Sequence, residues 1–412
     1  MVLARGERLP LRSKLEGLDR GLLLSALCLT GIGLILIYSA HHAQGGSAHF
    51  ERQLYFVVAG LVLLAVAAAI PGRVYYAFAY LIYGIALLGL LLVPLAGAMG
   101  FGARRWLTMG GLYIQPSEPA KLALIIAVSR VFAYRRHPYS GWKMMWMLAA
   151  LCLPPMALVA LQPNLGTATV FPVLGIALLA WFGLGARFFV LLFMPLLALL
   201  LTVSPWIVLP LLAAGFIWLM RSGVRWLGIT ALVLLCVAAT FIAPAAWHQL
   251  EPYQQKRLTT FLNPGVDPLG SGYQVIQSKV AIGSGGLTGR GFLKGTQTQL
   301  RFLPQQHTDF IFALAGEEFG FFGTSMIIIL FLMLGWRGFS LAARAKNQFM
   351  GLVAAGVTTM MMYHAGVNIG MAIGLLPVTG LPLPFISYGG SFLITCLVGT
   401  GLLLSVGLHR KE

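Results

Sequence analysis

Charge is scarce in this sequence. Only 9% of its 412 residues are charged, whereas 58% are hydrophobic, and the mean hydropathy is +0.85. Soluble globular domains carry about 25% charged residues, so this balance excludes a water-soluble fold. The sequence therefore predicts a chain whose solvent is the lipid bilayer.

Alternation of polar and apolar residues is missing as well. The strands of a membrane barrel alternate over about 10 residues, whereas runs such as 188–203 are apolar without a break. Since backbone N–H and C=O groups in a bilayer must be satisfied within their own segment, we expect α-helical spans of about 20 residues. The few cysteines lie inside apolar runs without C-x-x-C spacing, which supports neither a disulfide framework nor a thiolate metal site: Cys28, Cys152, Cys236 and Cys396.

Twelve apolar runs predict the membrane spans. They lie near residues 21–40, 54–70, 75–97, 119–134, 145–162, 167–183, 187–203, 205–220, 226–244, 309–335, 350–369 and 385–407. Only Ser204 and Pro205 separate the two runs within 187–220, which predict either a hairpin or one distorted element. We therefore expect an all-α polytopic integral membrane protein with ten or twelve spans and both termini on one side.

Lys and Arg are unevenly divided between the two predicted sides. The side of the termini receives 18 of the 28 basic residues and 4 of the 11 acids, a net charge of +14, whereas the other side has a net charge of +3. Because basic residues accumulate in short cytoplasmic loops, the termini are expected in the cytoplasm. The net charge of +17 is then a topology signal, and it does not indicate nucleic-acid binding.

One outward connection, residues 245–308, is much longer than the others. Loops of this length carry function or are disordered, and the aromatic residues within this one argue against disorder. Residues 274–282 predict a short amphipathic helix at the membrane interface. We expect an ordered cap, with a second outward segment, residues 95–117, packed beside it; this segment carries Arg104, Arg105 and Trp106.

Asp267 stands alone in this loop. It is the only acid between Glu251 and Asp309, and it shares the loop with six basic residues: Lys256, Arg257, Lys279, Arg290, Lys294 and Arg301. A lone carboxylate among cations suits a general base that acts on a phosphate-bearing substrate. The other interpretation is an Asx-turn before Pro268, which is a common use of Asp.

Glu118 and Lys121 lie three residues apart near the start of a predicted span, so they share one helical face. Ser117 is expected to cap this helix. Lys121 could present its charge to a phosphate at a helix N-terminus. The alternatives are a structural ion pair with Glu118 or a lysine that snorkels to the lipid headgroups.

Polar residues also enter the last three spans. His307 and Asp309 precede one of them, where Asp309 could serve as an N-cap, and Glu317 and Glu318 follow about two turns deeper. A carboxylate within a membrane span costs free energy unless it is paired with a cation, protonated or hydrated. Such acids are therefore functional candidates.

His364 and Asn368, an i,i+4 pair, predict a polar contact between helices. Residues 374–391 are too rich in Gly and Pro for a continuous helix. We expect a re-entrant or outward segment, buried against protein or lining a cavity.

These motifs resemble the SEDS family, the shape, elongation, division and sporulation proteins, over nearly the whole chain. The resemblance rests on residues 115–121 (QPSEPAK), 267–273 (DPLGSGY), 281–286 (AIGSGG), 303–304 (LP) with 307–312 (HTDFIF), and 374–391. Residues 294–300 (KGTQTQL) resemble the members that act in elongation more than those of division.

The resemblance implies an inverting peptidoglycan glycosyltransferase that polymerises lipid II at the outer face of the cytoplasmic (inner) membrane, together with a class B penicillin-binding protein. The family's essential acid corresponds to Asp267, which would deprotonate the acceptor hydroxyl. Its outer-face charges correspond to Arg105, Glu118 and Lys121, to which we add Lys279, His307 and Asp309 as substrate-binding candidates. A pyrophosphate leaves without a protonating acid, so cations are sufficient to stabilise it. The sequence leaves a divalent cation (Mg²⁺ or Mn²⁺) open, because it shows no cluster of metal ligands.

The chain also departs from the family pattern. Residues 187–224 resemble a hairpin inserted into a ten-span core within a single domain, residues 1–412. Asn164 stands where Asp is more usual, and Gln305 and Gln306 replace a charged pair. A flippase for lipid-linked sugar, a division-type polymerase and a non-catalytic scaffold remain alternatives, although we find no internal repeat of the kind transporters use.

Overall fold

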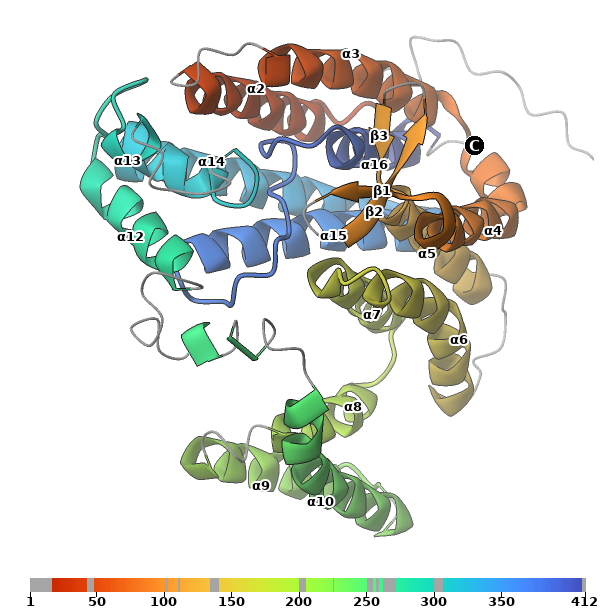
Figure 1. Cartoon of the computed structure of the whole chain (residues 1–412). Coiled ribbons are helices and arrows are strands. Elements are labelled where there is room, and N and C mark those ends of the chain that lie inside the picture. The colour runs from red at the N-terminus through yellow and green to blue at the C-terminus, as the bar shows by residue number, and fades with distance from the viewer. Residues whose placement is uncertain are drawn as a thin grey trace, which may run out of the picture. The chain divides into compact units, whose positions relative to one another are not determined.

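The computed structural model describes residues 17–42, 48–100, 103–109, 112–133, 141–199, 205–224, 226–249, 255–256, 259–261, 272–299 and 307–409. Within these ranges, twelve helices match the twelve apolar runs one for one (Figure 1): α2 (Arg20–His42), α3 (Ala48–Ala69), α4 (Gly72–Ala96), α5 (Ser117–Ala133), α6 (Gly141–Ala160), α7 (Leu165–Phe182), α8 (Ala186–Ala198), α9 (Pro205–Arg221), α10 (Trp226–Gln249), α14 (Ile311–Arg344), α15 (Gln348–Ala372) and α16 (Gly390–Leu408). The predicted all-α polytopic membrane fold is confirmed.

Length and hydropathy separate these helices into two classes. In the described part of the chain, eight of them are long and apolar enough to cross a membrane, whereas α8, α9 and the apolar part of α10 are shorter. The helix α5 has 17 residues, includes Glu118, Lys121 and Arg130, and belongs to neither class. The number of spans therefore stays a prediction.

The chain forms two compact units. The first comprises Met1–Phe182 and Pro264–Glu412, and the second is Gly183–Asn263. In the second unit α8, α9 and α10 pack against one another around Met194, Val208 and Leu232. The runs within 187–220 are thus two separate helices and not one distorted element.

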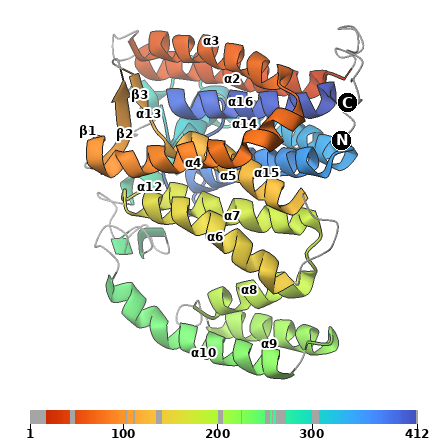
Figure 2. The same cartoon turned by 90° about the vertical axis from the view of Figure 1, so that its right-hand side faces the viewer.

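Helices α15 and α16 lie at the centre of the first unit, and most of their residues are buried. Figure 2 shows α16 beside α2 and α3, and small residues allow these close approaches. A Cβ atom at Gly401 would lie 2.4 Å from the carbonyl oxygen of Leu64 in α3, and one at Gly356 would lie 2.6 Å from Ile125 in α5. Glycine is therefore required at both helix crossings.

The connection from α4 to α5 folds into a small antiparallel sheet, which the sequence analysis missed. Its strand order is β1-β2-β3, with Ala98 opposite Trp106 and Leu107 opposite Ile114. The strands are β1 (Ala98–Gly100), β2 (Ala103–Met109) and β3 (Leu112–Ile114). The segment 95–117, which is predicted to face outward, thus contains a folded sheet.

A kink interrupts α14 at Gly320, where φ is 63° and ψ is −159°. The loop 286–295, which joins α12 (Tyr273–Gly285) to α13 (Thr296–Gln299), satisfies the backbone groups that the kink frees. Four main-chain hydrogen bonds do so: Arg290 to Glu317, Gly291 to Glu318, Phe321 to Gly286 and Phe322 to Leu287, at 2.9 to 3.1 Å. The helix α12 confirms the helix predicted over residues 274–282.

The described ends of the chain lie together. A Cβ atom at Gly407, near the end of α16, would lie 2.4 Å from the carbonyl oxygen of Gly17. The first unit therefore begins and ends at the same end of its helices, as an even number of spans requires. Which side of the membrane this end faces stays a prediction.

Candidate functional site

Residues 373–389, here called the connecting segment, join α15 to α16 without forming a helix. Its second half is buried, with Leu381, Leu383 and Ile386 fully enclosed, whereas its first half is exposed or half-buried, with Leu375 70% exposed. It turns at Gly374 and Gly380, where φ is 76° and 73°, values that favour glycine. The predicted irregular segment is confirmed, and its burial against protein is confirmed for residues 381–387 only.

Hydrogen bonds tie the connecting segment to the motif that precedes α14. The backbone N–H of Tyr388 donates to the carbonyl of His307 at 2.9 Å, and the hydroxyl of Ser387 donates to the carbonyl of Thr308 at 2.6 Å. Asn368 of α15 donates to the carbonyl of Asp309 at 2.9 Å. Three consecutive carbonyls are thus fixed, which positions the side chains of His307 and Asp309.

Asn368 makes a second bond, to the carbonyl of Leu381 at 2.8 Å. Its amide therefore joins two non-helical segments, and the contact predicted between helices is wrong for this residue. Asp309 does not cap α14 either, because the helix begins at Ile311 and its N-cap residue is Phe310. The carboxylate of Asp309 instead lies beside Gly380, where a Cβ atom would be 3.6 Å from Oδ2.

His307 lies in a group of aromatic rings. Its ring centroid is 5.0 Å from that of His41, 6.0 Å from that of His49 and 5.8 Å from that of Tyr388. Burial, followed by the neighbouring His41 and His49, lowers the pKa of His307 to about 4, and burial raises the pKa of the Tyr388 hydroxyl. At neutral pH His307 therefore offers a hydrogen bond and not a positive charge.

Glu118 and Lys121 form an ion pair inside the protein. Lys121 Nζ lies 2.7 Å from Glu118 Oε2 and 3.1 Å from Nε2 of His364, and the exposed fractions of the Lys121 and Glu118 side chains are 0% and 3%. The ring of Phe392 covers the ammonium group at 5.0 Å. Snorkelling is therefore wrong for Lys121, and the ion pair on one helical face is confirmed.

This buried cluster joins three helices, since α5 carries the ion pair, α15 carries His364 and α16 carries Phe392. The predicted helix–helix contact of His364 is confirmed. The N-cap assigned to Ser117 is wrong, because α5 begins at Ser117 and its buried hydroxyl has no hydrogen-bond partner in the described part of the chain.

Arg105 projects from β2 to the turn between α6 and α7. Its guanidinium donates to the carbonyls of Gln162 at 3.3 Å and Pro163 at 2.5 Å. Just beyond this turn, Gly166 of α7 packs against the connecting segment, since a Cβ atom there would lie 2.2 Å from the carbonyl oxygen of Thr379. The sheet and the connecting segment are thereby joined through one turn.

Lys279 and the two acids of α14, Glu317 and Glu318, complete the candidates. Lys279 on α12 is exposed and lies against Gly374, and the neighbouring Ser278 donates to the carbonyl of Ala372 at 2.6 Å. Glu317 accepts hydrogen bonds from the backbone of Gln297 at 2.8 Å and from the hydroxyl of Thr296 at 3.3 Å.

Arg290 donates to the Thr296 hydroxyl at 2.8 Å, so a loop cation reaches Glu317 through one hydroxyl group. Glu318 accepts a hydrogen bond from Ser39 of α2. Both carboxylates in α14 are thus held by hydrogen bonds from neighbouring segments.

Asp267 lies outside the described residues, so its predicted role stays a prediction. Among the residues that are described, His307, Asp309 and Lys279 surround the connecting segment, Arg105 joins it through the α6–α7 turn, and the ion pair is enclosed. No group of three or more His, Cys, Asp or Glu residues that could hold a metal occurs in these ranges.

Sequence reasoning missed Ser387, Tyr388, His41 and His49. A usable signal was present for the histidines, because His41 ends one span and His49 begins the next, and a short connection brings such positions together.

Comparisons with known proteins agree with this architecture. A family model for cell cycle proteins, named for FtsW, RodA and SpoVE, matches residues 20–214 and 207–412. The peptidoglycan glycosyltransferase MrdB of Escherichia coli K12 is 39% identical over 395 residues, which are 96% of this chain and 94% of MrdB.

Two solved structures are also similar over nearly the whole chain. A chain of a peptidoglycan synthase complex that coordinates polymerization and crosslinking has a TM-score of 0.71 at 32% identity, covering 96% of this chain and 99% of that chain. The rod shape determining protein RodA of Thermus thermophilus has a TM-score of 0.61 at 28% identity, covering 96% and 98%.

Proposed function

Because the chain belongs to the FtsW, RodA and SpoVE family of cell cycle proteins, we propose that it is a peptidoglycan glycosyltransferase that polymerises lipid II during cell elongation. It is a multi-pass protein of the inner membrane. The similarity to MrdB and to RodA extends over more than nine-tenths of the chain, so it includes both the helices and the outward segments.

The attachment of the long outward loop to the connecting segment carries this proposal. Ser278 binds the carbonyl of Ala372, immediately before the connecting segment, and the carbonyls of His307 and Thr308 bind its far end. The part of the loop that follows Asp267 in sequence is therefore anchored at two places on one scaffold. A fixed scaffold of this kind suits a reaction that must align a base, a donor and an acceptor.

In the proposed reaction the 4-hydroxyl of the acceptor sugar attacks the anomeric carbon of the donor. Asp267 takes the hydroxyl proton, the new glycosidic bond forms with inversion, and the lipid pyrophosphate leaves with the bonding electrons. Arg105 stabilises the negative charge on the departing pyrophosphate. The candidates beside the connecting segment, Lys279, His307 and Asp309, contact the sugar and phosphate groups of the substrate.

Glu118 and Lys121 act differently in this proposal. Each neutralises the other inside the protein, so their contact with substrate would require the pair to open. We assign them the role of holding α5 against α15 and α16. Helix α15 carries Asn368, and α16 carries Ser391, whose hydroxyl accepts a hydrogen bond from the backbone N–H of Gln115 at 3.1 Å.

A partner that crosslinks the product is also part of the proposal. One structural neighbour belongs to a complex in which polymerization and crosslinking are coordinated. We propose a class B penicillin-binding protein as this chain's partner, with its transpeptidase domain on the outer side of the membrane.

The test is polymerisation of fluorescent lipid II by the purified chain with its partner in detergent, with the product separated by length on a gel. We expect Asp267→Ala and Asp267→Asn to abolish the polymer while monodispersity and thermal unfolding stay unchanged. Glu251→Gln, an acid of the same loop, is the matched control and should retain activity. Parallel reactions with EDTA, Mg²⁺ or Mn²⁺ measure whether a divalent cation contributes.

Polymer from a well-folded Asp267→Ala protein would remove Asp267 as the base. A wild-type chain that moves lipid II between the leaflets of a vesicle without forming polymer would be a flippase. A partner that forms polymer equally well without this chain would make the chain a scaffold.

A further inference from the structure

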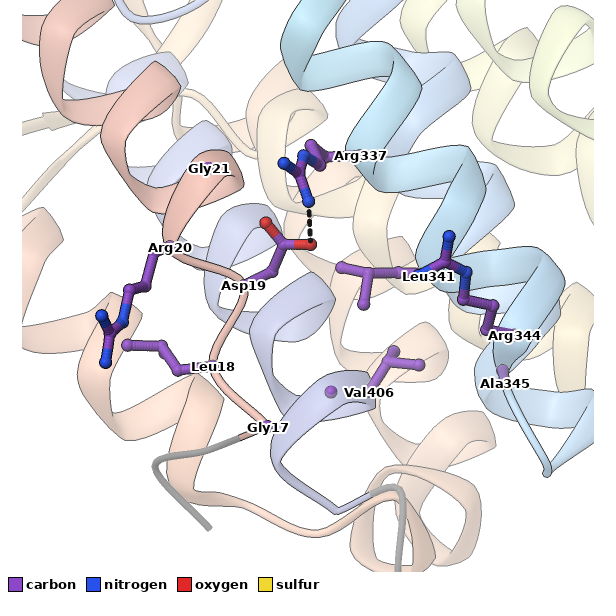
Figure 3. A pocket seen from close by; sticks show the side chains of 11 residues that line it. Gly17, Leu18, Asp19, Arg20, Gly21, Arg337, Leu341, Arg344, Ala345 and Val406 are labelled. Carbon is purple, nitrogen blue, oxygen red and sulfur yellow. Dashed lines mark ion pairs between the residues drawn. The ribbon is translucent and has the colours of Figure 1, made fainter. Parts of the chain in front are cut away.

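A cavity of about 380 Å³ lies at the end of the first unit where the described chain begins and ends. The start of α2, the end of α14 and the end of α16 line it, as Figure 3 shows. This volume is at the lower end of the range for small-molecule sites. It is sufficient for a small headgroup and not for a whole lipid.

Cations outnumber acids in the lining of this cavity. Arg20, Arg337 and Arg344 contribute to it, and the only acid among the described lining residues is Asp19. Figure 3 shows Arg337 reaching from α14 toward Asp19, with Arg344 two turns further along the same helix. The lining therefore has a formal charge of +2.

Asp19 forms only a long ion pair with Arg337. Its Oδ1 accepts the backbone N–H of Leu22 at 2.9 Å and caps α2, while Oδ2 is 3.7 Å from the Arg337 guanidinium, beyond hydrogen-bonding distance. The guanidinium of Arg337 packs against Gly21 of α2, where a Cβ atom would lie 3.0 Å from Nε of Arg337. The side chain of Arg337 is 45% exposed, so its remaining donors are accessible.

Arg344 has neither a hydrogen bond nor an ion pair among the residues that the structure describes. Its position in the last turn of α14 has a structural interpretation, because a cation there stabilises the negative end of the helix dipole. The N-terminal end of α2, which faces the same cavity, has the opposite polarity and favours an anion.

Apolar side chains, Leu18, Leu341 and Val406, line the cavity beside the arginines. A site that combines guanidinium groups with apolar walls matches a phosphate group attached to an acyl chain better than it matches a free inorganic ion. Basic pockets between membrane helices at the cytoplasmic face bind anionic headgroups in this way. The positive-inside rule predicts that this end of the helices faces the cytoplasm.

We propose that this cavity binds the phosphate of an anionic phospholipid headgroup, held by Arg337 and Arg344 at the cytoplasmic end of α14. The site lies apart from every residue to which we assign a part in glycosyl transfer. Lipid binding at this site can therefore be measured independently of glycosyl transfer.

The experiment uses the full chain in nanodiscs of phosphatidylcholine alone or mixed equally with phosphatidylglycerol. Native mass spectrometry counts the lipids that remain bound, and a titration in detergent gives the affinity for each lipid. We expect Arg344→Gln and Arg337→Gln each to weaken phosphatidylglycerol binding about fivefold, with no change for phosphatidylcholine. Arg73→Gln, an exposed arginine predicted on the same face but outside the cavity, is the matched control and should bind like wild type.

Two further arms distinguish a bound phospholipid from a soluble phosphate ester and from an arginine that only stabilises its helix. Glycerol 3-phosphate should compete only weakly, and competition as strong as that of phosphatidylglycerol would show that the ligand is a soluble phosphate ester. Equal loss of thermal stability in both nanodisc compositions for Arg344→Gln, with unchanged lipid binding, would show that this arginine only stabilises α14. Equal effects of Arg344→Gln and Arg73→Gln on lipid binding would also overturn the proposal.

Discussion

The buried ion pair of α5 and the arginine-lined cavity contain the same kinds of groups in different surroundings. In the first, Lys121 has no exposed surface and its acid lies at 2.7 Å, whereas in the second Arg337 is 45% exposed and its acid lies at 3.7 Å. A charge removed from water depends on its partner, whereas an exposed pair is screened. Enclosure therefore decides whether a cation here serves the fold or is accessible to a ligand.

The largest expected effect follows from breaking the enclosed pair. Lys121→Ala leaves Glu118 buried without its cation, and we expect a loss of about 3–5 kcal/mol in the free energy of unfolding. Thermal unfolding in detergent measures the loss, and polymerisation should fall with it.

The double variant Lys121→Met/Glu118→Leu is the matched control, because it removes both charges and keeps similar volumes. It should recover most of the stability. A Lys121→Ala protein as stable as wild type, with reduced turnover, would instead place Lys121 at the substrate.

An intermediate effect is expected at His307, which is only partly enclosed. Its pKa is lowered from 6.5 to about 4 in the folded protein, so the unfolded chain binds the proton more readily between these values. Stability should consequently fall as the pH drops from about 6.5 to 4, and this group should contribute no slope above or below that window.

Melting temperatures across this pH range check the sign. His307→Phe should flatten the slope. A wild-type protein with no slope between pH 6.5 and 4 would show that His307 is hydrated in the folded state.

The smallest effect is expected from the exposed pair. Arg337→Gln should change the free energy of unfolding by less than about 1 kcal/mol in phosphatidylcholine, because exposed ion pairs contribute little. Thermal unfolding in nanodiscs of phosphatidylcholine alone gives the value. A loss as large as that of Lys121→Ala would show that the arginine cavity is part of the fold, and the contrast between the two regions would then disappear.

The helices were accessible to sequence reasoning because lipid imposes long apolar runs, and all twelve runs became helices. The sheet of residues 98–114 was not, since three short strands leave little periodic signal. The irregular nature of residues 374–391 was visible in their glycines and prolines.

The partners of individual polar residues could not be predicted in the same way. The spacing of Glu118 and Lys121 predicted their pairing, because both lie on one helix. The bond from Ser387 to Thr308 and the group formed by His41, His49 and His307 join segments far apart in sequence. Their partners depend on how helices pack, which no local pattern specifies.

The kink at Gly320 limits which residues of the adjoining loop can vary. Only main-chain groups make the four hydrogen bonds that attach residues 286–291 to α14. Any residue other than proline has both the N–H and the C=O group that such bonds use. The other side chains along this stretch can therefore be exchanged during evolution without releasing it from the helix. Four glycines are the exceptions, because φ is positive at Gly286, Gly289, Gly291 and Gly320. A Cβ atom at Gly320 would also lie 2.3 Å from the backbone nitrogen of Gly289. These four residues without side chains thus preserve the attachment of residues 286–291 to α14.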